Sequence, residues 1–381
     1  MKPNLFFSHA RRWATSIALA CSLLLVTVSL AYAAYTWTQK TTASKPSARF
    51  QHAMAYLGGD QALLFGGDDG SYRDDTWVYD LGDNTWTNQN PGAKPSARFS
   101  PVMAYLGGDQ ALLLGGSSGS GWITETWTYD LGDNAWTNKS PAVSPGGYNS
   151  ALAYIGGNKA LLFGGENADG DDCLDDTWVY DLSANTWTNP NPGAKPPKRY
   201  LHAMTYIGDD QVLLFGGCDF NCSTYYNDTW VYDLSANTWT NQDPGGSKPS
   251  ARESSAMAYV GGDQALLFGG EDAAYNRQND TWSYDLSANT WTQKSPTSSP
   301  SARDMHTMAY LGNEWVVLFG GSVSGGDRDD ETWVAEGMGP TAVTLSSFDA
   351  QVGQDSVLPY AFSLVALAGA GWLVWRKRAR K

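Results

Sequence analysis

The chain has 381 residues and a formal net charge of −14 at pH 7, and 42% of its residues are hydrophobic. That length suits one large domain or two ordinary ones, with enough apolar surface for a sizeable core. Nucleic acid is a poor partner for so acidic a chain, because the phosphates would be repelled. Helix-type periodicity is nearly absent from the middle of the chain, and 41 glycines separate short β-rich runs. The composition therefore predicts an all-β fold with many turns.

The N-terminal segment has the pattern of a secretory signal peptide. Residues 1–13 carry Lys2, Arg11 and Arg12 and no acid, and an apolar run follows to Ala33. Small residues at Ala31 and Ala33 provide a cleavage site. We expect residues 1–33 to be a signal peptide. An uncleaved signal anchor is the alternative, because the apolar run is almost long enough to span a bilayer.

A sequence repeat occupies the middle of the chain. Each copy reads roughly "PSARxxHAMAYLGGDQALLFGG", then a variable loop, then "DTWVYDLxxNTWT", and the copies are 49 to 53 residues apart. The copies align on paired glycines at Gly66-Gly67, Gly115-Gly116, Gly164-Gly165, Gly216-Gly217, Gly269-Gly270 and Gly320-Gly321. A period near 50 residues is typical of propeller repeats in which each copy forms one blade.

Each copy contains four strand patterns. "HAMAYLG" and "QALLFGG" are short apolar runs joined by a glycine turn, and "TWVYDL" alternates so that Trp77 and Tyr79 share one face and Val78 takes the other. The "GDN" and "SAN" segments are hairpin turns. A lone four-stranded sheet cannot bury both faces, whereas radial stacking of several sheets does. We therefore predict a six-bladed β-propeller of four-stranded antiparallel blades over residues 34–337.

The double glycine after an apolar strand and the spaced Trp and Tyr positions resemble the kelch motif in all six copies, from about Tyr35 to Val334. The resemblance implies a kelch-repeat propeller of a secreted or membrane-anchored prokaryotic type. It also implies that ligands bind on the propeller face that carries the variable loops.

Closure of the ring follows from the incomplete sixth copy. That copy ends at "ETWVAEGMG" and lacks the second Trp segment, which "YTWTQK" at residues 35–40 supplies with Trp37. The N-terminal strand is thus expected to complete the last blade. "VTLSSFDAQ" at residues 343–351 is the alternative closing strand, although it has no Trp.

The copies differ in length in two segments only, and both are expected on the same propeller face. One segment joins the paired glycines to the first Trp, and the other joins the second Trp to the next Arg position. Loops on a rigid scaffold commonly carry binding sites, so this face is the predicted ligand-binding face. Its aromatic candidates are Tyr72, Trp122, Tyr225, Tyr226 and Tyr275. Solvated acidic turns without a ligand are the alternative.

Two residue types recur at fixed repeat positions near the predicted channel. Arginines open most innermost strands, at Arg49, Arg98, Arg199, Arg252 and Arg303, with Gly147 in the third copy. A ring of Arg is able to clamp a carboxylate, or it serves as a structural link between blades. Histidines share the position of His52, His202 and His306; a metal site would require them to converge, which placement in separate blades opposes.

The variable loops also contain the remaining cysteines and a cluster of acids. Cys173, Cys218 and Cys222 are an odd number outside the signal segment, so Cys218 with Cys222 is the expected disulfide, and Cys173 with either is the alternative. The segment "NADGDD" suggests a weak calcium site at Asp169, Asp171 and Asp172. No other cofactor is predicted.

The C-terminal segment has the pattern of a membrane anchor. Residues 357–375 contain no charge and can just span a bilayer, and five of the last six residues are basic. Basic clusters stay on the cytoplasmic side. We expect a linker or stalk over residues 338–356, a transmembrane helix over 357–375 and a cytoplasmic tail over 376–381, with the propeller outside the cell.

The predicted function is a cell-surface binding module that recognises a protein or a glycan through its acidic and aromatic loops. No catalytic residue is assigned. The kelch resemblance also admits extracytoplasmic enzymes of the sialic-acid mutarotase or galactose oxidase type, and a purely structural spacer is the third possibility.

Overall fold

The computed structural model describes residues 35–146, 148–167 and 169–336. The predicted signal peptide, stalk, transmembrane helix and tail lie outside these residues. Within them, no helix has the length and hydropathy needed to span a bilayer.

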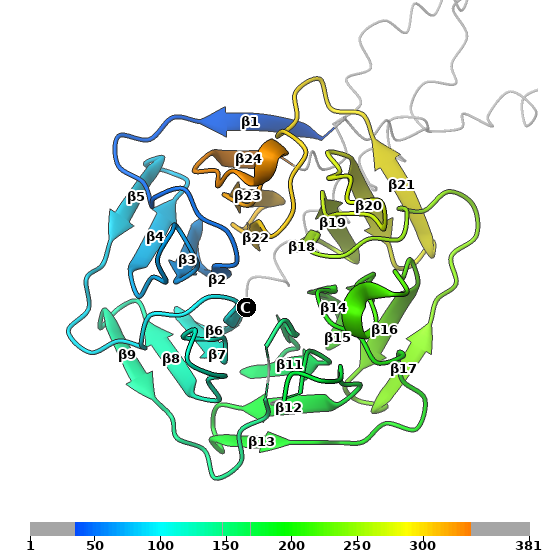
Figure 1. Ribbon diagram of the computed structural model, residues 1–381, viewed down its shortest axis with the longest axis horizontal. Helices are drawn as coiled ribbons and strands as arrows, with labels where there is room; N and C mark the ends of the chain where they lie inside the picture. The colour runs from blue at the N-terminus through cyan, green and yellow to red at the C-terminus, as the bar shows by residue number, and fades with distance from the viewer. Residues whose placement is uncertain (1–34, 147, 168, 337–381) are drawn as a thin grey trace, which may run out of the picture. The chain divides into compact units, whose positions relative to one another are not determined.

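Six four-stranded antiparallel sheets surround a central axis (Figure 1). The innermost strands are β2 (Ala53–Gly58), β6 (Val102–Gly107), β10 (Ala151–Tyr154), β14 (Ala203–Gly208), β18 (Ala256–Gly261) and β22 (Thr307–Tyr310). The second strands are β3 (Gln61–Phe65), β7 (Gln110–Leu114), β11 (Lys159–Phe163), β15 (Gln211–Phe215), β19 (Gln264–Phe268) and β23 (Trp315–Phe319). This is the six-bladed propeller that the repeats predict.

The outer half of each blade comes from the "TWVYDL" segment and the hairpin after it. The third strands are β4 (Thr76–Asp80), β8 (Thr126–Asp130), β12 (Thr177–Asp181), β16 (Thr229–Asp233), β20 (Thr281–Asp285) and β24 (Thr332–Glu336). The outermost strands are β5 (Thr85–Asn88), β9 (Ala135–Asn138), β13 (Thr186–Thr188), β17 (Thr238–Asn241), β21 (Thr290–Lys294) and β1 (Thr36–Lys40). Two single-turn 3-10 helices, Phe220–Cys222 and Ser324–Gly326, lie in the loops.

The N-terminal strand closes the ring, as the incomplete sixth copy predicts. The last sheet has the order β1-β24-β23-β22, and β1 pairs antiparallel to β24 with Trp37 opposite Ala335. The first and last described segments of the chain therefore share one blade.

The core lies between neighbouring blades. In the first blade Leu63 and Leu64 point to opposite faces and both are fully buried, each in a different cluster. Both faces of the second strand are covered, which explains its continuous apolar sequence. In β4, Tyr79 joins the cluster of Leu64 while Val78 joins that of Leu63, as the alternation predicts. Each fully buried Leu contributes roughly 1.5–3 kcal/mol.

The paired glycines hold each blade against the next one. Gly66 and Gly67 have φ angles of 73° and 93°, which L side chains rarely adopt, and a Cβ on Gly66 would lie 2.9 Å from the carbonyl oxygen of Arg98. The amide of Gly67 donates to that carbonyl at 2.9 Å. Glycine thus permits a backbone contact between the first and second blades.

Strand direction places both variable segments of every repeat at one end of the propeller, here named the loop face. The short turns between first and second strands, and between third and fourth strands, lie at the opposite end, named the turn face. Short bridges join the two variable segments within each blade, as where Phe50 pairs with Asp68 and Asp68 with Tyr72. The loop face is therefore an ordered surface.

Candidate functional site at the loop face

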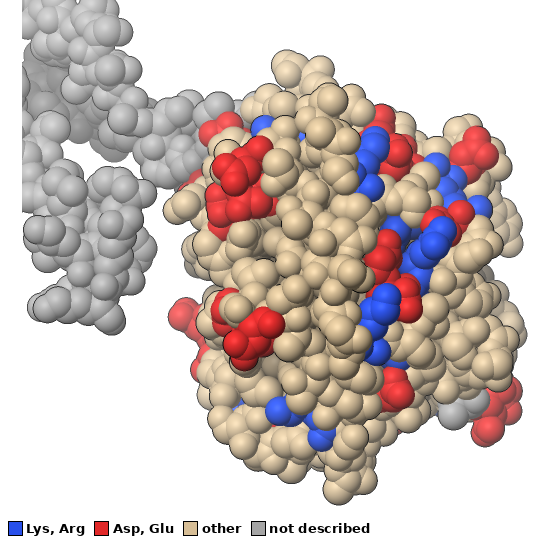
Figure 2. Space-filling view, turned by 90° about the vertical axis from the view of Figure 1, so that its left-hand side faces the viewer, with Lys and Arg blue, Asp and Glu red and all other residues tan. Residues whose placement is uncertain are grey.

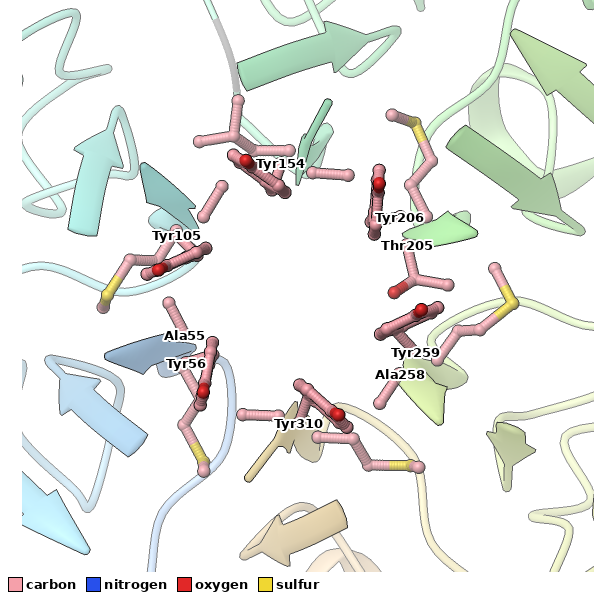
Figure 3. A pocket seen from close by; sticks show the side chains of 18 residues that line it. Ala55, Tyr56, Tyr105, Tyr154, Thr205, Tyr206, Ala258, Tyr259 and Tyr310 are labelled. Atoms are coloured by element: carbon pink, nitrogen blue, oxygen red, sulfur yellow. The ribbon is translucent and has the colours of Figure 1, made fainter. Parts of the chain in front are cut away.

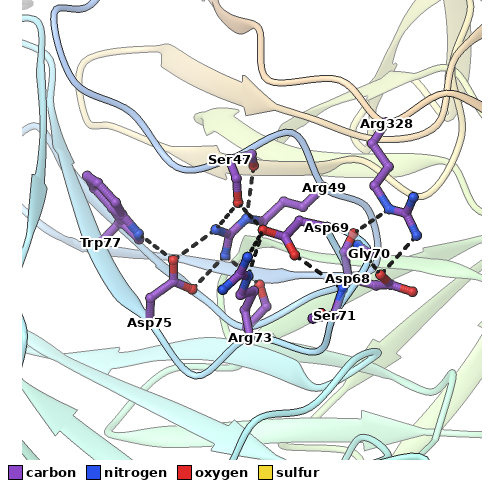
Figure 4. Close-up of polar contacts among 11 residues, drawn as sticks. Ser47, Arg49, Asp68, Asp69, Gly70, Ser71, Arg73, Asp75, Trp77 and Arg328 are labelled. Atoms are coloured by element: carbon purple, nitrogen blue, oxygen red, sulfur yellow. Dashed lines mark hydrogen bonds and ion pairs between the residues drawn. The ribbon is translucent and has the colours of Figure 1, made fainter.

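The five repeat arginines are buried and hydrogen-bonded inside their own blades. Arg49 is 1% exposed, and all its N–H groups have acceptors (Figure 4). Its Nη1 donates to the Gly66 carbonyl at 2.9 Å and to Asp75 at 2.6 Å, and Nη2 donates to Asp75 at 2.8 Å. Arg98, Arg199, Arg252 and Arg303 are at most 1% exposed and bond in the same manner. None of them lines the cavities on the propeller axis. These arginines therefore link segments within a blade, and their guanidinium groups do not face the channel.

An acidic residue couples each of these arginines to the first Trp of its blade. Asp75 accepts a hydrogen bond from the indole nitrogen of Trp77 at 2.8 Å, in addition to its contacts with Arg49. Burial opposes ionisation of Asp75, but Arg49 and Trp77 together outweigh it and lower the pKa of the carboxyl group. The acid, the arginine and the indole thus form one charge-compensated unit at the base of the loops.

Lysines add a second, more exposed set of ion pairs that point back to the preceding blade. Lys94 lies 3.0 Å from Asp74, and Lys45 lies 3.0 Å from Asp330. In side view, basic groups lie beside acidic groups in a band across the wall that carries β5 and β9 (Figure 2). The same pair recurs between Lys195 and Asp175. Three of the connections between blades are therefore held to the preceding blade by a lysine.

The repeat histidines are buried without charge. Burial, followed by the nearby charges of Arg49 and Arg199, lowers the pKa of both His52 and His202 to about 3. The pKa of His306 is lowered in the same direction, again mainly by burial. His52 contacts the Thr307 hydroxyl at 2.6 Å. Among the described residues these histidines form no metal-binding group.

A ring of residues in the left-handed backbone conformation frames the opening at the loop face. It consists of Gln51, Ser100, Asn149, Leu201, Ser254 and Met305, whose φ angles lie between 51° and 56°. The amide of Ser100 donates to the carbonyl of Gln51 at 2.8 Å, and Met305 donates to Ser254 at 3.1 Å in the same way. These conformations cost about 1 kcal/mol each for residues other than glycine. Each ring residue directly follows the repeat position of Phe50. The ring contains no glycine, so the sequence gives no signal for it.

Aromatic side chains pack against one another on the loop face across the first three blades. The rings of Tyr72 and Phe99 are stacked with centroids 4.6 Å apart, and Phe99 meets Tyr148 edge-on at 5.6 Å. Trp122 lies against Tyr148 at 3.8 Å, and Tyr72 is 37% exposed. We name these four residues the aromatic half of the loop face. Tyr72 and Trp122 are among the residues predicted from the sequence, whereas Phe99 and Tyr148 are not.

Carboxylates occupy the repeat position of Phe99 in the fifth and sixth blades. Glu253 and Asp304 are 7% and 1% exposed. Arg277 donates from Nε to Asp304 at 2.6 Å and lies 3.7 Å from Glu271. We name Glu253, Glu271 and Asp304 the acidic half of the loop face.

Two of the three carboxyl groups in the acidic half, those of Glu271 and Asp304, thus share the guanidinium group of Arg277. Burial, and then the charges of Glu271 and Asp304, raise the pKa of Glu253 to about 7. Burial likewise raises the pKa of Glu271 and of Asp304. The cluster has three carboxyl groups against one arginine, so a further basic group placed there would favour the ionised form of Glu253.

A disulfide between Cys218 and Cys222 lies beside Glu253. The carboxyl Oε2 of Glu253 is 2.9 Å from Cys218 Sγ and 2.8 Å from Cys222 Sγ. Because disulfide sulfurs carry no hydrogen, the neutral carboxyl group is the donor in this contact. Cys173 is a buried free thiol.

The remaining aromatic candidates have different surroundings. Tyr226 packs under the guanidinium of Arg199, 4.2 Å from ring centre to Cζ. Tyr225 is half-buried, and burial followed by the charge of Glu253 raises its pKa to about 12. Tyr275 is 77% exposed. Tyr225 thus borders the acidic half, and Tyr226 belongs to the arginine link of its blade.

The acidic loop of the third blade is held by internal contacts. The Asn167 amide donates to Asp171 at 2.7 Å, and Asp172 forms an ion pair with Lys198. Among the described residues, Asp169, Asp171 and Asp172 do not form a metal-binding group. Calcium binding at this loop stays a prediction.

Comparisons with known proteins agree with the repeat architecture. The KLHDC2/KLHL20/DRC7 Kelch-repeats domain matches residues 23–217 and 137–321, which together cover more than half of the chain. Adagio protein 3 of Arabidopsis thaliana is 30% identical over 159 residues, and Adagio-like protein 1 of Oryza sativa subsp. japonica is 28% identical over 159 residues. Each alignment covers 40% of this chain and 25% of the relative.

An F-box/kelch-repeat protein of Arabidopsis thaliana is 28% identical over 178 residues, which are 43% of this chain and 37% of that protein. The aligned part is thus well under half of the length of each of these curated relatives. The matched residues include strands of all six blades and end before β24. The chain belongs to the family of KLHDC2/KLHL20/DRC7 Kelch-repeats domains.

Proposed function

We propose that this kelch propeller is a protein-binding module of the cell surface, and that its loop face binds a partner segment in which a basic side chain neighbours an apolar one. Kelch propellers typically act as protein-interaction modules. The division of one opening into an aromatic half and an acidic half is the observation that carries the proposal.

The two halves complement different side chains of one segment. The stacked rings of Tyr72 and Phe99 offer an apolar surface, of which Tyr72 is the exposed part. Glu271 and Asp304 share Arg277, and Glu253 forms no ion pair with the described residues, so a partner Lys or Arg would supply the missing charge. A basic residue flanked by an aromatic or aliphatic residue would contact both halves.

The cell-surface setting rests on the two ends of the sequence. Residues 1–33 have the composition of a signal peptide, and residues 357–375 have that of a membrane anchor with a basic end. The propeller would then face outward, where the disulfide between Cys218 and Cys222 is expected to persist.

A peptide-display selection against the purified full chain at pH 7.5 tests the proposal. Selected peptides should contain Lys or Arg next to an apolar residue. Their affinity, measured by calorimetry, should fall about tenfold in Glu271→Gln, because a charge-assisted hydrogen bond contributes about 1.5–3 kcal/mol. Tyr72→Ala should weaken the same peptides through loss of the apolar contact.

Asp83→Asn is the matched control, because it removes one exposed carboxylate from a turn on the opposite face. It should leave peptide affinity unchanged. Selected peptides without basic residues, or equal losses in the Asp83 and Glu271 variants, would contradict the proposal.

A glycan is the second candidate ligand. The exposed face of Tyr72 beside polar groups suits a sugar ring, which stacks on aromatic surfaces. A neutral oligosaccharide would depend on Tyr72 far more than on Glu271, so the same two variants separate the two ligand classes.

A further inference from the structure

A closed ring of six tyrosines lines the axial cavity near the turn face. Every innermost strand contributes one of them at the same repeat position: Tyr56, Tyr105, Tyr154, Tyr206, Tyr259 and Tyr310. The cavity has a volume of about 270 Å³, and its other lining residues are Met, Leu, Ala and Thr. Figure 3 shows the six phenol rings around an open centre.

The ring is close to a regular hexagon. Neighbouring centroids are 5.0 to 5.3 Å apart at all six junctions. The interplanar angles at these junctions lie between 55° and 66°, near the 60° that six-fold rotation of planes parallel to the axis requires. In Figure 3 the rings are accordingly seen almost edge-on, each turned obliquely to the centre.

In a regular hexagon, the distance from the centre to each corner equals the distance between adjacent corners. A group on the axis would therefore lie about 5.2 Å from all six centroids at once. Cations are attracted to aromatic faces within about 6 Å of the centroid. The axis lies within that distance of all six rings, whose faces are turned obliquely toward it.

The polar atoms of the ring leave the lumen apolar. The hydroxyls of Tyr56, Tyr105 and Tyr259 donate to backbone carbonyls three residues further on, at 3.3, 3.2 and 3.1 Å. No charged side chain lines the cavity among the described residues. A ligand inside would meet aromatic surface, thioethers and methyl groups, which suits an ion that carries its own alkyl groups.

Carboxylates near the turns surround the ring from outside. Burial, and in addition the negative charges of Asp60, Asp109, Asp209, Asp210, Asp263 and Glu314, raise the pKa of the tyrosines of the ring. Lys159, the basic residue at the corresponding turn of the third blade, is paired with Asp181. The field at the turn-face end is therefore negative and favours a cation over an anion or a neutral molecule.

We propose that the tyrosine ring binds a small quaternary ammonium ion such as choline, held on the axis by cation–π contacts with the six phenols. The cavity volume lies just below the roughly 300–1,000 Å³ of pockets for drug-sized ligands, which limits the guest to a small molecule. This site lies at the opposite end of the axis from the loop face and is independent of partner binding there.

Calorimetric titration of the purified full chain, in a maltoside detergent, tests the site. Choline chloride is compared with 3,3-dimethylbutan-1-ol, which has the same shape without the charge. Choline should bind at least tenfold more tightly, because burial of the alkyl groups is common to both ligands and only choline gains cation–π attraction. Equal binding of the two, or no heat from choline up to 50 mM, would overturn the proposal.

Two opposed rings are then replaced together. Tyr105→Leu with Tyr259→Leu should weaken choline about tenfold while leaving the neutral alcohol nearly unchanged. Tyr105→Phe with Tyr259→Phe keeps both aromatic faces and should bind choline within about twofold of the native chain. Thermal unfolding of both double variants verifies that they are folded.

Single replacements, Tyr105→Leu and Tyr259→Leu, provide the measurement if the double leucine variant does not fold. Each should weaken choline about two- to fivefold. Choline affinity that is the same in the leucine and phenylalanine variants would overturn the assignment, because only the leucine variants lack an aromatic face.

Discussion

The indole nitrogen of Trp37 donates a hydrogen bond to the Thr281 hydroxyl, 3.0 Å away and 244 residues further along the chain. The same contact joins each outer Trp to the preceding blade, as between Trp86 and Thr332 at 2.9 Å. Trp37 also meets Phe268 edge-on at 5.4 Å. The strand that closes the ring is therefore held by the same contact as the strands inside it.

Replacement of Trp37 should loosen the closure more than an equivalent change elsewhere. Trp37→Ala is expected to cost about 3–5 kcal/mol through loss of packing. Unlike β9, β1 is not joined to its neighbouring strand by a hairpin. Amide hydrogen exchange should therefore become faster in β1 and β24 specifically.

Trp136→Ala in the second blade is the matched control for the closure. It removes the corresponding indole, which bonds Thr76 at 2.9 Å. It should destabilise the protein without accelerating exchange in β1. Identical exchange patterns in the two variants would show that closure has no weakness of its own.

Removal of a buried arginine should reveal the strength of the link inside each blade. Arg252→Ala leaves the carbonyl of Gly269 without the guanidinium donor and removes the charged partner of Asp280, which keeps only the indole of Trp282, so we expect a loss of about 3–5 kcal/mol in urea unfolding. Asp280→Asn should be costly as well, and the double variant should show strong coupling. Lys94→Ala removes only an exposed pair with Asp74 and should cost less than about 1 kcal/mol. Similar losses at Arg252 and Lys94 would refute this ranking.

Glu253 should make the protein less stable as the pH rises. Its pKa is raised from 4.5 to about 7, so its stabilising contribution is complete below pH 4.5 and is lost as the pH passes through 7. The loss by pH 8.5 is expected to reach about 3 kcal/mol. Urea unfolding between pH 5 and 8.5 should show a smaller decline for Glu253→Gln. An unchanged decline would mean that ionisation of Glu253 has no part in it.

The buried histidines should act in the opposite direction. Their folded-state pKa values lie well below 6.5, so their contribution is present above pH 6.5 and is lost as the pH falls toward 3. A triple variant with His52→Ser, His202→Ser and His306→Ser tests this. Serine is chosen because Ser255 occupies this position in the fifth repeat. Between pH 6.5 and 4 the triple variant should lose less stability than the native chain, by about 1 kcal/mol or more per histidine. Parallel stability curves would contradict this expectation.

The blade architecture could be predicted because it is written in repeated local signals. The spacing of Gly66-Gly67 and of Trp77 and Trp86 recurs in copy after copy, and the absence of the second Trp from the last copy indicates which strand closes the ring. Patterning of this kind defines strands and turns before any long-range contact is known.

The site was harder to predict because it depends on backbone geometry that leaves no local signal. Gln51 and Leu201, which follow Phe50 and Tyr200, adopt left-handed conformations without glycine. The arginines turn into their own blades because an acid two residues before the first Trp accepts their hydrogen bonds. That acid was visible in the sequence, but only the fold shows that it lies beside the arginine.

The tyrosine ring is absent from the predicted site for a different reason. Tyr56 and its counterparts occur at one position in every repeat, so their regularity suggested scaffold. Regularity around a closed axis also places six equivalent side chains at one point. A binding site is therefore indicated by either of two patterns: a position that varies from copy to copy, or an invariant position that faces the axis.

Blade number determines how far apart the members of each axial ring stand, whereas the contacts between neighbouring blades are alike all round the propeller. Recombination between such similar gene segments would add or delete a whole blade. A descendant with one blade more or fewer would keep the Trp–Thr contact at each junction and still widen or narrow both openings. Repeat duplication would thus change the pore size without requiring a new kind of contact between blades.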